Sequence, residues 1–304
     1  MFKFFSSSKK NNVIGVEFKS TGIAVVEAIL SGKKAGMIVR HDFIEGIGQQ
    51  EQELALNSWV KENDAEKTIC HCLVSQDDYN LFQVEHPEVS DEEATEAIKW
   101  KIKDLLSFDV DNAVIESYPM PESSKTTVKQ INVVAANDSA IRAYIEVLKH
   151  SGLELDVLDI SELALNNIFK HVDLGDNTIG VLLLTERRGQ LYVFKKGVLY
   201  VVRDFKIGLN QLKNTESPEE TYDSVLLEVQ RSLDYFEGYY GIGGISKLYI
   251  SPQLVELESM ANYLQNYVSF ELDFLTASNI CAFNENLDFD HRCFMAYCLA
   301  LRED

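Results

Sequence analysis

The stretch Ile14-Gly15-Val16-Glu17-Phe18-Lys19-Ser20-Thr21-Gly22-Ile23-Ala24-Val25-Val26-Glu27 carries the strongest fold signal of this 304-residue chain. Two β-rich runs, 13–17 and 23–30, flank a short polar turn that ends in Gly22. This pattern is typical of a β-hairpin, because a turn residue such as glycine separates two runs of strand-forming residues. The chain therefore begins with paired strands.

The elements that follow the hairpin predict a mixed α/β half. The patterns favour a strand over 36–43, a helix over 50–61 and a strand over 68–74. Between 79 and 151 the pattern changes to strand, helix, strand, strand and helix, which predicts an inserted α+β subdomain. A strand over 155–160 and a helix over 161–169 complete this half.

The rest of the chain starts again with strands, over 178–184, 190–194 and 198–207. The halves therefore resemble each other, which indicates an internal structural repeat. The longest predicted helix, 219–236, has an apolar face and a second stripe formed by Ser224, Glu228, Arg231 and Tyr235. Such a polar stripe is in most cases simply a solvated face.

Composition excludes several classes of function. The 28 Lys and Arg residues against 48 Asp and Glu give a net charge of −20, which argues against general binding to nucleic acid or anionic lipid. No apolar run reaches the roughly 18 to 20 residues that a membrane helix needs. Five cysteines follow no secretory leader, so we expect a reduced, cytoplasmic protein.

Two groups of residues suggest chemistry at first sight. Cys70-His71-Cys72 looks like a metal-binding motif, but in a strand the two thiols share one face and His71 lies on the other. No second Cys pair completes a zinc site, so buried thiols are the preferred interpretation and no metal is predicted. The chain also lacks GxSxG and HExxH motifs, so catalysis by such groups has no sequence support.

Four segments resemble PilM, the actin-like family of type IV pilus assembly. They are the hairpin 14–27, the region 135–160 with the run AYIEVLKHSGLELDVLDI, the helix segment 228–235 and the ending 296–302. They occur in the family's order along nearly the whole chain. The Phe-Lys-Phe-Phe start and the eroded motifs are most similar to the MshI branch, which serves biogenesis of the mannose-sensitive haemagglutinin (MSHA) pilus.

The resemblance implies a two-lobed, actin-like (ribonuclease H-like) ATPase fold with an inserted subdomain of the FtsA and PilM type. It predicts a flexible N-terminus over 1–12 and an inserted subdomain over 79–149. The first lobe would comprise 13–78 and 150–174, and the second 175–304, with 213–244 as its helical part.

Family members of this fold hold ATP between two hairpins, and the resemblance places Glu17 at the acidic position of the first. Lys19 stands where the family has glycine, and Ala24 replaces its phosphate-contacting lysine. Ser20, Thr21 and Gly22 keep the small polar character of the turn. This hairpin is altered but still compatible with a phosphate.

The second hairpin departs further, since Leu183 occupies the acidic position and Thr185 the glycine. In the adenosine region Glu228, Arg231 and Ser232 match the family, but Pro252-Gln253 replaces its glycine pair, and proline has no amide hydrogen. We therefore expect a non-catalytic pseudo-ATPase with no required cofactor. Weak binding of ATP and Mg²⁺ at a vestigial cleft remains an alternative, as does a working actin-like ATPase.

The resemblance also implies a partner. We expect an adaptor that binds the short cytoplasmic tail of a PilN-like inner-membrane protein and reaches the membrane only through it. The tail should lie in a groove between 13–27 and 79–116. A soluble relative of the GspL cytoplasmic domain of type II secretion is the further alternative, and no residue pattern indicates nucleic acid as a partner.

Overall fold

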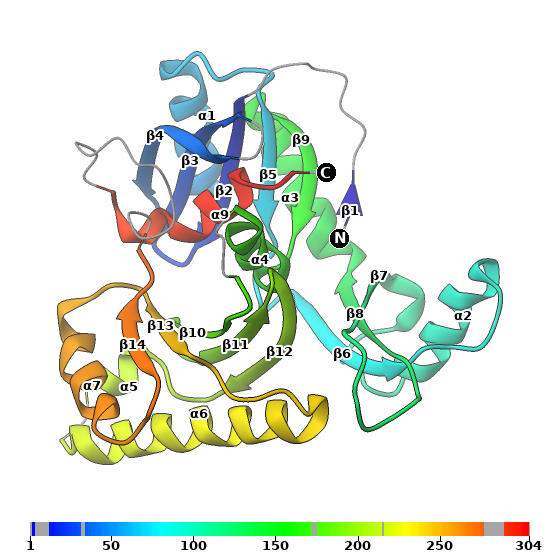
Figure 1. The fold of residues 1–304 in the computed structure, drawn as a ribbon. Helices are drawn as coiled ribbons and strands as arrows, with labels where there is room; N and C mark the ends of the chain where they lie inside the picture. The colour runs from blue at the N-terminus through cyan, green and yellow to red at the C-terminus, as the bar shows by residue number, and fades with distance from the viewer. Residues whose placement is uncertain are drawn as a thin grey trace. The chain divides into compact units, whose positions relative to one another are not determined.

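A computed structural model describes residues 2–3, 12–31, 34–171, 175–214, 216–276 and 289–303. The chain divides into two compact units (Figure 1). Unit 1 comprises Met1–Met120, Val128–Asn167 and Phe283–Asp304, and unit 2 comprises Pro121–Thr127 and Ile168–Ala282.

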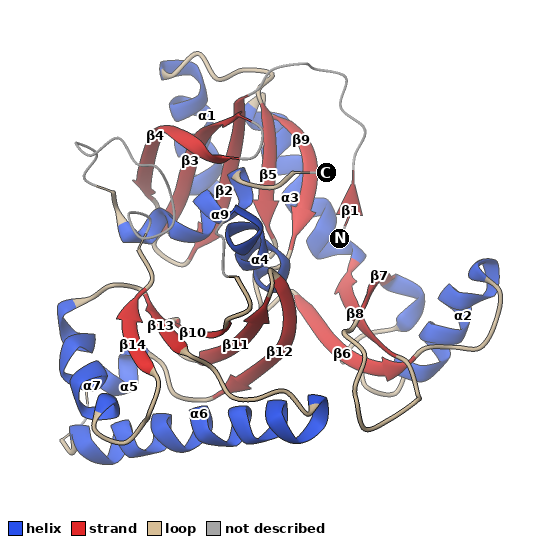
Figure 2. Cartoon of the chain, in the orientation of Figure 1, coloured by secondary structure: helices blue, strands red, loops and turns tan. Residues whose placement is uncertain are grey.

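Unit 1 is built on a six-stranded sheet with the order β1-β9-β5-β2-β3-β4 (Figure 2). β2, β3 and β4 form an antiparallel meander, whereas β2 pairs parallel with β5 and β5 pairs parallel with β9. The strands are β1 (Phe2–Lys3), β2 (Asn12–Lys19), β3 (Gly22–Ser31), β4 (Lys34–Glu45), β5 (Ile69–Leu73) and β9 (Glu154–Asp159).

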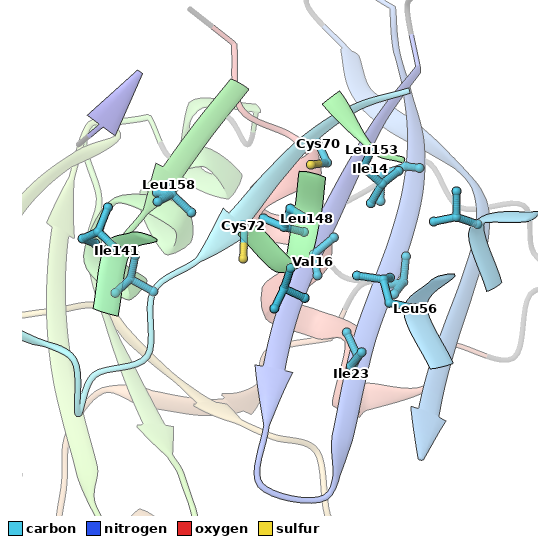
Figure 3. Close-up of a cluster of buried hydrophobic side chains, with 14 of the residues drawn as sticks. Ile14, Val16, Ile23, Leu56, Cys70, Cys72, Ile141, Leu148, Leu153 and Leu158 are labelled. Atoms are coloured by element: carbon cyan, nitrogen blue, oxygen red, sulfur yellow. The ribbon is translucent and has the colours of Figure 1, made fainter. Parts of the chain in front are cut away.

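Helices cover both faces of this sheet. Side chains of α1 (Gln49–Glu62) and α3 (Asp138–Ser151) share one apolar cluster with Ile14, Val16, Cys70 and Cys72 (Figure 3). Alternate strand residues point to opposite faces, so Gly15 faces α9 (Phe294–Ala300), which packs on β2, β3 and β5 after the 3-10 turn His291–Cys293. A Cβ on Gly15 would stand 1.8 Å from the carbonyl oxygen of Ala296, so this close approach requires glycine.

A smaller sheet with the order β6-β8-β7 is inserted into unit 1. All its pairings are antiparallel, and Ile98 and Ile102 of α2 pack on Ile131 and Val133. Its elements are β6 (Tyr79–Glu85), α2 (Asp91–Ile102), the 3-10 turn Val110–Asn112, β7 (Ala113–Pro119) and β8 (Gln130–Asn137). This is the predicted α+β insertion.

Unit 2 holds a five-stranded sheet with the order β12-β11-β10-β13-β14. α4 (Ser161–His171) crosses from unit 1 into unit 2, and α6 lies within the expected helical part 213–244. The other elements are β10 (Thr178–Leu184), β11 (Gly189–Lys195), β12 (Val198–Phe205), α5 (Leu209–Lys213), α6 (Pro218–Tyr240), β13 (Lys247–Ser251), α7 (Val255–Gln265) and β14 (Glu271–Phe274).

The two sheets repeat one topology. In unit 2 an antiparallel meander, β10-β11-β12, is followed by β13 and β14, each parallel to its inner neighbour. Reading β4-β3-β2-β5-β9 in unit 1 gives the same sequence of pairings. The predicted likeness of the two halves is therefore confirmed.

The boundaries differ from those expected in two places. The range 175–304 was expected in one lobe, but 283–304 belongs to unit 1, because α9 packs on its large sheet. Within 79–149, α3 packs with α1 on the large sheet as well as against β7 and β8 of the small one, and the loop Pro121–Thr127 belongs to unit 2.

The expected flexible N-terminus, 1–12, also contains structure. Phe2 and Lys3 form β1 against β9, and Asn12 begins β2. Residues 4–11 lie outside the described parts of the chain. Among the described helices, none combines the length and the apolar character that a membrane crossing would require.

Candidate functional site

The first hairpin joins β2 and β3 through Ser20 and Thr21, both of which are exposed. Gly22 is buried directly after this turn, where a Cβ would lie 2.3 Å from the carbonyl oxygen of Ile44. The turn therefore presents two hydroxyl groups to solvent on a backbone that is closely packed underneath.

The acidic position of this hairpin is already paired with a cation of the chain. The Nζ atom of Lys19 lies 2.7 Å from Oε1 of Glu17. The other carboxylate oxygen, Oε2, is buried and has no hydrogen-bond partner among the described residues. A buried carboxylate oxygen without a partner is costly, so this side of the Glu17 carboxylate destabilises the folded hairpin.

One residue that contacts the first hairpin, Gln52, was not predicted from the sequence. The side chain of Gln52, in α1, is buried and donates from Nε2 to the carbonyl oxygens of Lys19, at 2.7 Å, and Gly46, at 3.1 Å. These contacts fix the turn against α1. No sequence signal marks them, because a glutamine on a helix is normally solvated.

The second hairpin joins β10 and β11 and is apolar at the corresponding position. Leu183 is only 7% exposed, stands opposite Gln190 and pairs in register with Ser251 of β13. All seven residues of β10 are buried, as is usual for a central strand that is covered on both faces. Leu183 is therefore part of the core of unit 2.

The turn of the second hairpin is closed by its own groups. The amide of Thr185 donates to the carbonyl oxygen of Arg188, and the amide of Arg188 donates to Oγ1 of Thr185. The first amides of α5, those of Leu209 and Asn210, donate to the carbonyl oxygens of Thr185 and Glu186. The amides of Thr185 and Arg188 are thus occupied, whereas a phosphate site needs free amides.

On α6 the three predicted residues are close together, and they interact chiefly with one another. Nη1 of Arg231 lies 3.2 Å from Oε1 of Glu228, on the surface of the helix. Ser232 is buried, and its hydroxyl donates to the backbone carbonyl oxygen of Glu228 at 2.6 Å. That hydroxyl therefore serves the helix backbone, and the exposed pair offers no unpaired charge.

A pocket of about 250 Å³ opens in unit 1 beside the first hairpin. It combines one residue of β2, the start of α1, a residue before β6 and one face of α3. Its lining residues are Phe18, Gln49, Gln52, Asp78, Ala140, Ala143, Tyr144 and Val147. The expected groove between 13–27 and 79–116 shares only Phe18 with this pocket, whose opposite wall comes from α3.

A polar contact closes one end of the pocket. The hydroxyl of Tyr144 donates to Oδ2 of Asp78 at 2.6 Å and accepts from the amide of Ser75. Burial and the neighbouring Asp78 carboxylate raise the pKa of Tyr144, so the hydroxyl stays protonated. The ring of Phe18 lies 6.0 Å from that of Tyr144. The pocket is thus a largely apolar hollow with a carboxylate at its rim.

A buried polar cluster lies where β9 ends and α4 begins. Asp159 is fully buried, and its Oδ2 lies 2.6 Å from Nη1 of Arg302. Glu162 is also buried and accepts from the hydroxyl of Tyr79 at 2.7 Å. This cluster was not predicted, because its members are far apart along the chain and have no recognisable spacing.

The Cys-His-Cys segment of β5 has the geometry predicted for a strand. Cys70 and Cys72 lie in the core formed with α1 and α3. On the other face of the sheet, Nδ1 of His71 lies 3.0 Å from the carbonyl oxygen of Leu299 in α9. Burial raises the pKa of both thiols. Across the described residues, no three potential ligands are grouped as a metal site would require.

These observations define the class of fold. No protein-family model matches this sequence, and no curated protein matches it either. Solved structures do match, and among them is a Bacteroides thetaiotaomicron protein with an actin-like ATPase fold and unknown function. It is 9% identical, the match covers 90% of this chain and 93% of that one, and the TM-score is 0.51. The chain has an actin-like ATPase fold.

Two further structures share this fold. A chain of the PilM–PilN type IV pilus biogenesis complex is 17% identical, with 95% of this chain and 97% of that chain covered and a TM-score of 0.72. The cytoplasmic domain of EpsL, an inner-membrane component of the type II secretion system of Vibrio cholerae, is 13% identical. That match covers 84% and 96% of the two chains at a TM-score of 0.52.

Proposed function

We propose that this protein is a non-catalytic adaptor of a type IV pilus assembly complex, which binds the cytoplasmic tail of a PilN-like inner-membrane protein. The observation that carries the proposal is the match along 95% of the chain to a component of a PilM–PilN complex. The altered hairpins and the pocket in unit 1 support it independently. The similar start and eroded motifs favour a role in the MSHA-type, MshI branch.

The pseudo-ATPase part of the proposal rests on the two hairpins. Leu183 is a core residue and has no group that could hold a metal or activate water. In the first hairpin the carboxylate of Glu17 is paired with Lys19. Each half therefore lacks a free acid at the position where an actin-like ATPase would use one.

The adaptor part rests on the pocket of about 250 Å³. Extended peptides commonly bind by inserting apolar side chains into pockets while their backbone pairs with the protein. This hollow has room for one such anchor, between Phe18 and the small residues Ala140 and Ala143. Asp78 at its rim and the net charge of −20 favour a tail with Arg or Lys beside the anchor.

Titration of synthetic tails tests the proposal. Labelled peptides of the cytoplasmic tails of inner-membrane pilus proteins from the same operon are added to the full-length protein. We expect a dissociation constant in the micromolar range, about −8 kcal/mol, because ordering a flexible tail offsets part of the contact energy. Ala143→Trp fills the pocket and should abolish binding.

Lys149→Trp is the matched control, because it adds the same side chain to an exposed position of α3 outside the pocket. It should leave the affinity unchanged. If every tail fails to bind the wild-type protein, the adaptor proposal is refuted. If a tail binds and Ala143→Trp has no more effect than Lys149→Trp, the pocket is not the docking site.

The match to the EpsL domain supports a second candidate function. The protein would then be a soluble relative of that type II secretion domain and would act in a different assembly. The same titration separates the two. A tail from a pilus operon should bind under the leading proposal, whereas only a component of a secretion system should bind under the alternative.

A further inference from the structure

The surface of unit 2 carries a row of three tyrosine rings where α7 packs against the first half of α6 (Figure 1). The centre of the Tyr263 ring, in α7, lies 5.5 Å from that of Tyr222 in α6 and 5.0 Å from that of Tyr267, which follows α7. None of the three side chains is buried, and Tyr267 is 57% exposed. This row, the tyrosine patch, is therefore open to solvent.

A carboxylate of α6 lies beside these rings. The hydroxyl of Tyr263 donates to Oδ1 of Asp223 at 2.6 Å. Hydrogen bonds to Asp223 and Tyr267 raise the pKa of Tyr263, so its hydroxyl stays protonated. The Asp223 side chain is exposed, and its Oδ2 atom has no partner among the described residues. The tyrosine patch thus includes a carboxylate oxygen that is free to bind a ligand.

The two helices that carry the tyrosine patch are strongly acidic. The only basic residue of α6 is Arg231, which pairs with Glu228, and α7 has no basic residue. Lys213 of α5 lies 3.6 Å from Glu256, at the start of α7. The acidic residues of the two helices are Glu219, Glu220, Asp223, Glu228, Asp234, Glu237, Glu256 and Glu258. This charge favours a basic ligand and repels anionic lipid and acidic segments.

At other places the chain puts its own cations over aromatic rings. Nζ of Lys103 lies 3.6 Å from the centre of the Trp100 ring, and the guanidinium carbon of Arg203 lies 5.1 Å from that of Tyr235. A cation is attracted to the face of an aromatic ring by the ring's quadrupole. In the described part of the chain, no cation lies over a ring of the tyrosine patch. These rings are therefore available to a cation from another molecule.

Exposed apolar side chains extend the patch along both helices. Val255 is 76% exposed and lies on the same stripe of α7 as Tyr263, two helical steps of four residues earlier. Leu227 is 45% exposed and lies one such step after Asp223 on α6. A segment that combines cations with apolar residues would bury these side chains as well.

We propose that the tyrosine patch of α6 and α7 docks a basic segment of a second protein, whose arginine side chains stack on the rings and pair with Asp223. Arginine suits this surface, because its planar guanidinium both stacks on aromatic rings and binds carboxylates. Apolar residues between the arginines cover Leu227 and Val255. The patch lies in unit 2, whereas the pocket proposed for the membrane partner's tail lies in unit 1. Docking here therefore does not depend on whether that pocket is filled.

Titration of a designed peptide tests this surface. A fluorescent peptide, Leu-Arg-Leu-Arg-Leu-Arg with blocked ends, is added to the full-length protein and its anisotropy is followed. We expect Tyr267→Ala and Asp223→Asn each to weaken binding by at least about fivefold, because each removes a group that the arginines contact. Ala143→Trp, which fills the pocket of unit 1, should leave the affinity unchanged.

Asp234→Asn is the matched control for charge, because it removes a carboxylate from another exposed position of α6. Asp234 lies about 16 Å along the helix from Asp223, beyond the Debye length of about 8 Å at physiological salt. Its loss should change the affinity by less than about twofold. A peptide with citrulline in place of arginine keeps the shape of the side chains without their charge, and it should not bind.

Nuclear magnetic resonance of protein with ring-labelled tyrosine locates the contact. The arginine peptide should shift the ring signals of Tyr222, Tyr263 and Tyr267. It should leave those of Tyr235 and Tyr239, in the last turns of α6, unchanged.

Several results would overturn the proposal. They are absence of binding, equal losses in Asp223→Asn and Asp234→Asn, equal binding of the citrulline peptide, loss of binding in Ala143→Trp, and shifts confined to tyrosines outside the patch. A wild-type dimer in sedimentation that Tyr267→Ala dissociates would overturn it too, since a second copy of this chain would then occupy the patch.

Discussion

The six-stranded sheet of unit 1 and the five-stranded sheet of unit 2 share the pairing pattern of five strands, yet the hairpins that begin these patterns have opposite chemistry. In unit 1 the hairpin keeps a carboxylate, Glu17, one oxygen of which is buried without a described partner. In unit 2 the corresponding position is Leu183, in a strand whose residues are all buried. The shared topology thus depends on apolar alternation and turns, whereas the polar groups at the hairpins differ between the two halves.

The central strands β2 and β10 also differ in what packs against the glycine that each contains. Gly15 of β2 lies against the backbone of α9, whereas Gly180 of β10 lies against the side chains of Leu248 and Ile245. Backbone cannot move aside as a side-chain end can. The sheet of unit 1 is therefore packed more rigidly at this point than the sheet of unit 2.

The largest expected effect comes from exchanging the chemistry of the two hairpins. Leu183→Asp removes a buried apolar side chain and buries a carboxylate without a partner, so we expect a loss of about 4 kcal/mol or more in the free energy of unfolding. Glu17→Leu should change it by less than about 1 kcal/mol, because it removes a costly buried oxygen along with a single ion pair. Urea unfolding followed by circular dichroism measures both.

Equal losses in these two variants would contradict the comparison. They would mean that the carboxylate of Glu17 stabilises unit 1 as much as Leu183 stabilises unit 2. Leu183→Met serves as the control for volume, and it should cost less than about 1.5 kcal/mol.

Replacing Gly15 or Gly180 by alanine should give the next largest changes in stability. Gly15→Ala forces a Cβ to within 1.8 Å of the Ala296 carbonyl oxygen, so α9 must shift, and we expect a loss of about 3 kcal/mol. Gly180→Ala meets Cδ1 of Leu248 at 2.7 Å, which can rotate away, so about 1 kcal/mol is expected. Thermal unfolding of the two variants ranks them, and a larger loss for Gly180→Ala would contradict the difference in rigidity.

Much of the fold was predictable because both halves follow simple periodicity. The hairpin 14–27, the strand 178–184 and the long helix 219–236 all appear as expected, within a few residues at their ends. Alternation and turn chemistry are local properties, so one sequence suffices to find them. The return of 283–304 to unit 1 depends instead on the long-range contact between α9 and Gly15, which no local pattern encodes.

The candidate site was less predictable, because its contacts also join residues that are far apart in the sequence. Its residues could be placed on hairpins and helices, but their partners could not. Lys19 neutralises Glu17, and the Ser232 hydroxyl is used by the carbonyl oxygen of Glu228. Gln52, which ties the first turn to α1, comes from a different element, so its role appears only in three dimensions.

A smaller difference in stability between the two units is expected at alkaline pH. All four described cysteines lie in unit 1, and burial raises the pKa of Cys293 to about 12 and those of Cys70 and Cys72 as well. Unfolded thiols ionise near pH 8.5. The stability that comes from neutral thiols is thus fully present below about pH 8.5 and is lost as the pH rises toward the folded values.

Each thiol should lower the free energy of unfolding by up to about 1.4 kcal/mol per pH unit in this range. Unfolding curves between pH 8 and pH 11 measure the slope, and Cys293→Ala should reduce it by one proton's contribution. Iodoacetamide should modify these thiols slowly in the native protein at pH 8. A slope that Cys293→Ala leaves unchanged would show that this thiol does not ionise on unfolding.

The smallest expected effect concerns ATP hydrolysis, because each of the two hairpins leads us to expect none. The purified protein should release no phosphate from ATP in a Mg²⁺-dependent manner above a blank, because Leu183 has no group that could hold a metal or activate water and the turn amides of Thr185 and Arg188 are already paired. Any residual nucleotide binding should depend on the predicted cleft residues, Glu17, Ser20, Thr21, Glu228 and Arg231.

A phosphate-release assay of the wild type and of Glu17→Ala tests for hydrolysis, since the two rates should both equal the blank. Turnover that Glu17→Ala abolishes would refute the pseudo-ATPase interpretation, and it would mean that a single acidic hairpin can support the chemistry without a carboxylate at the corresponding position of the other half.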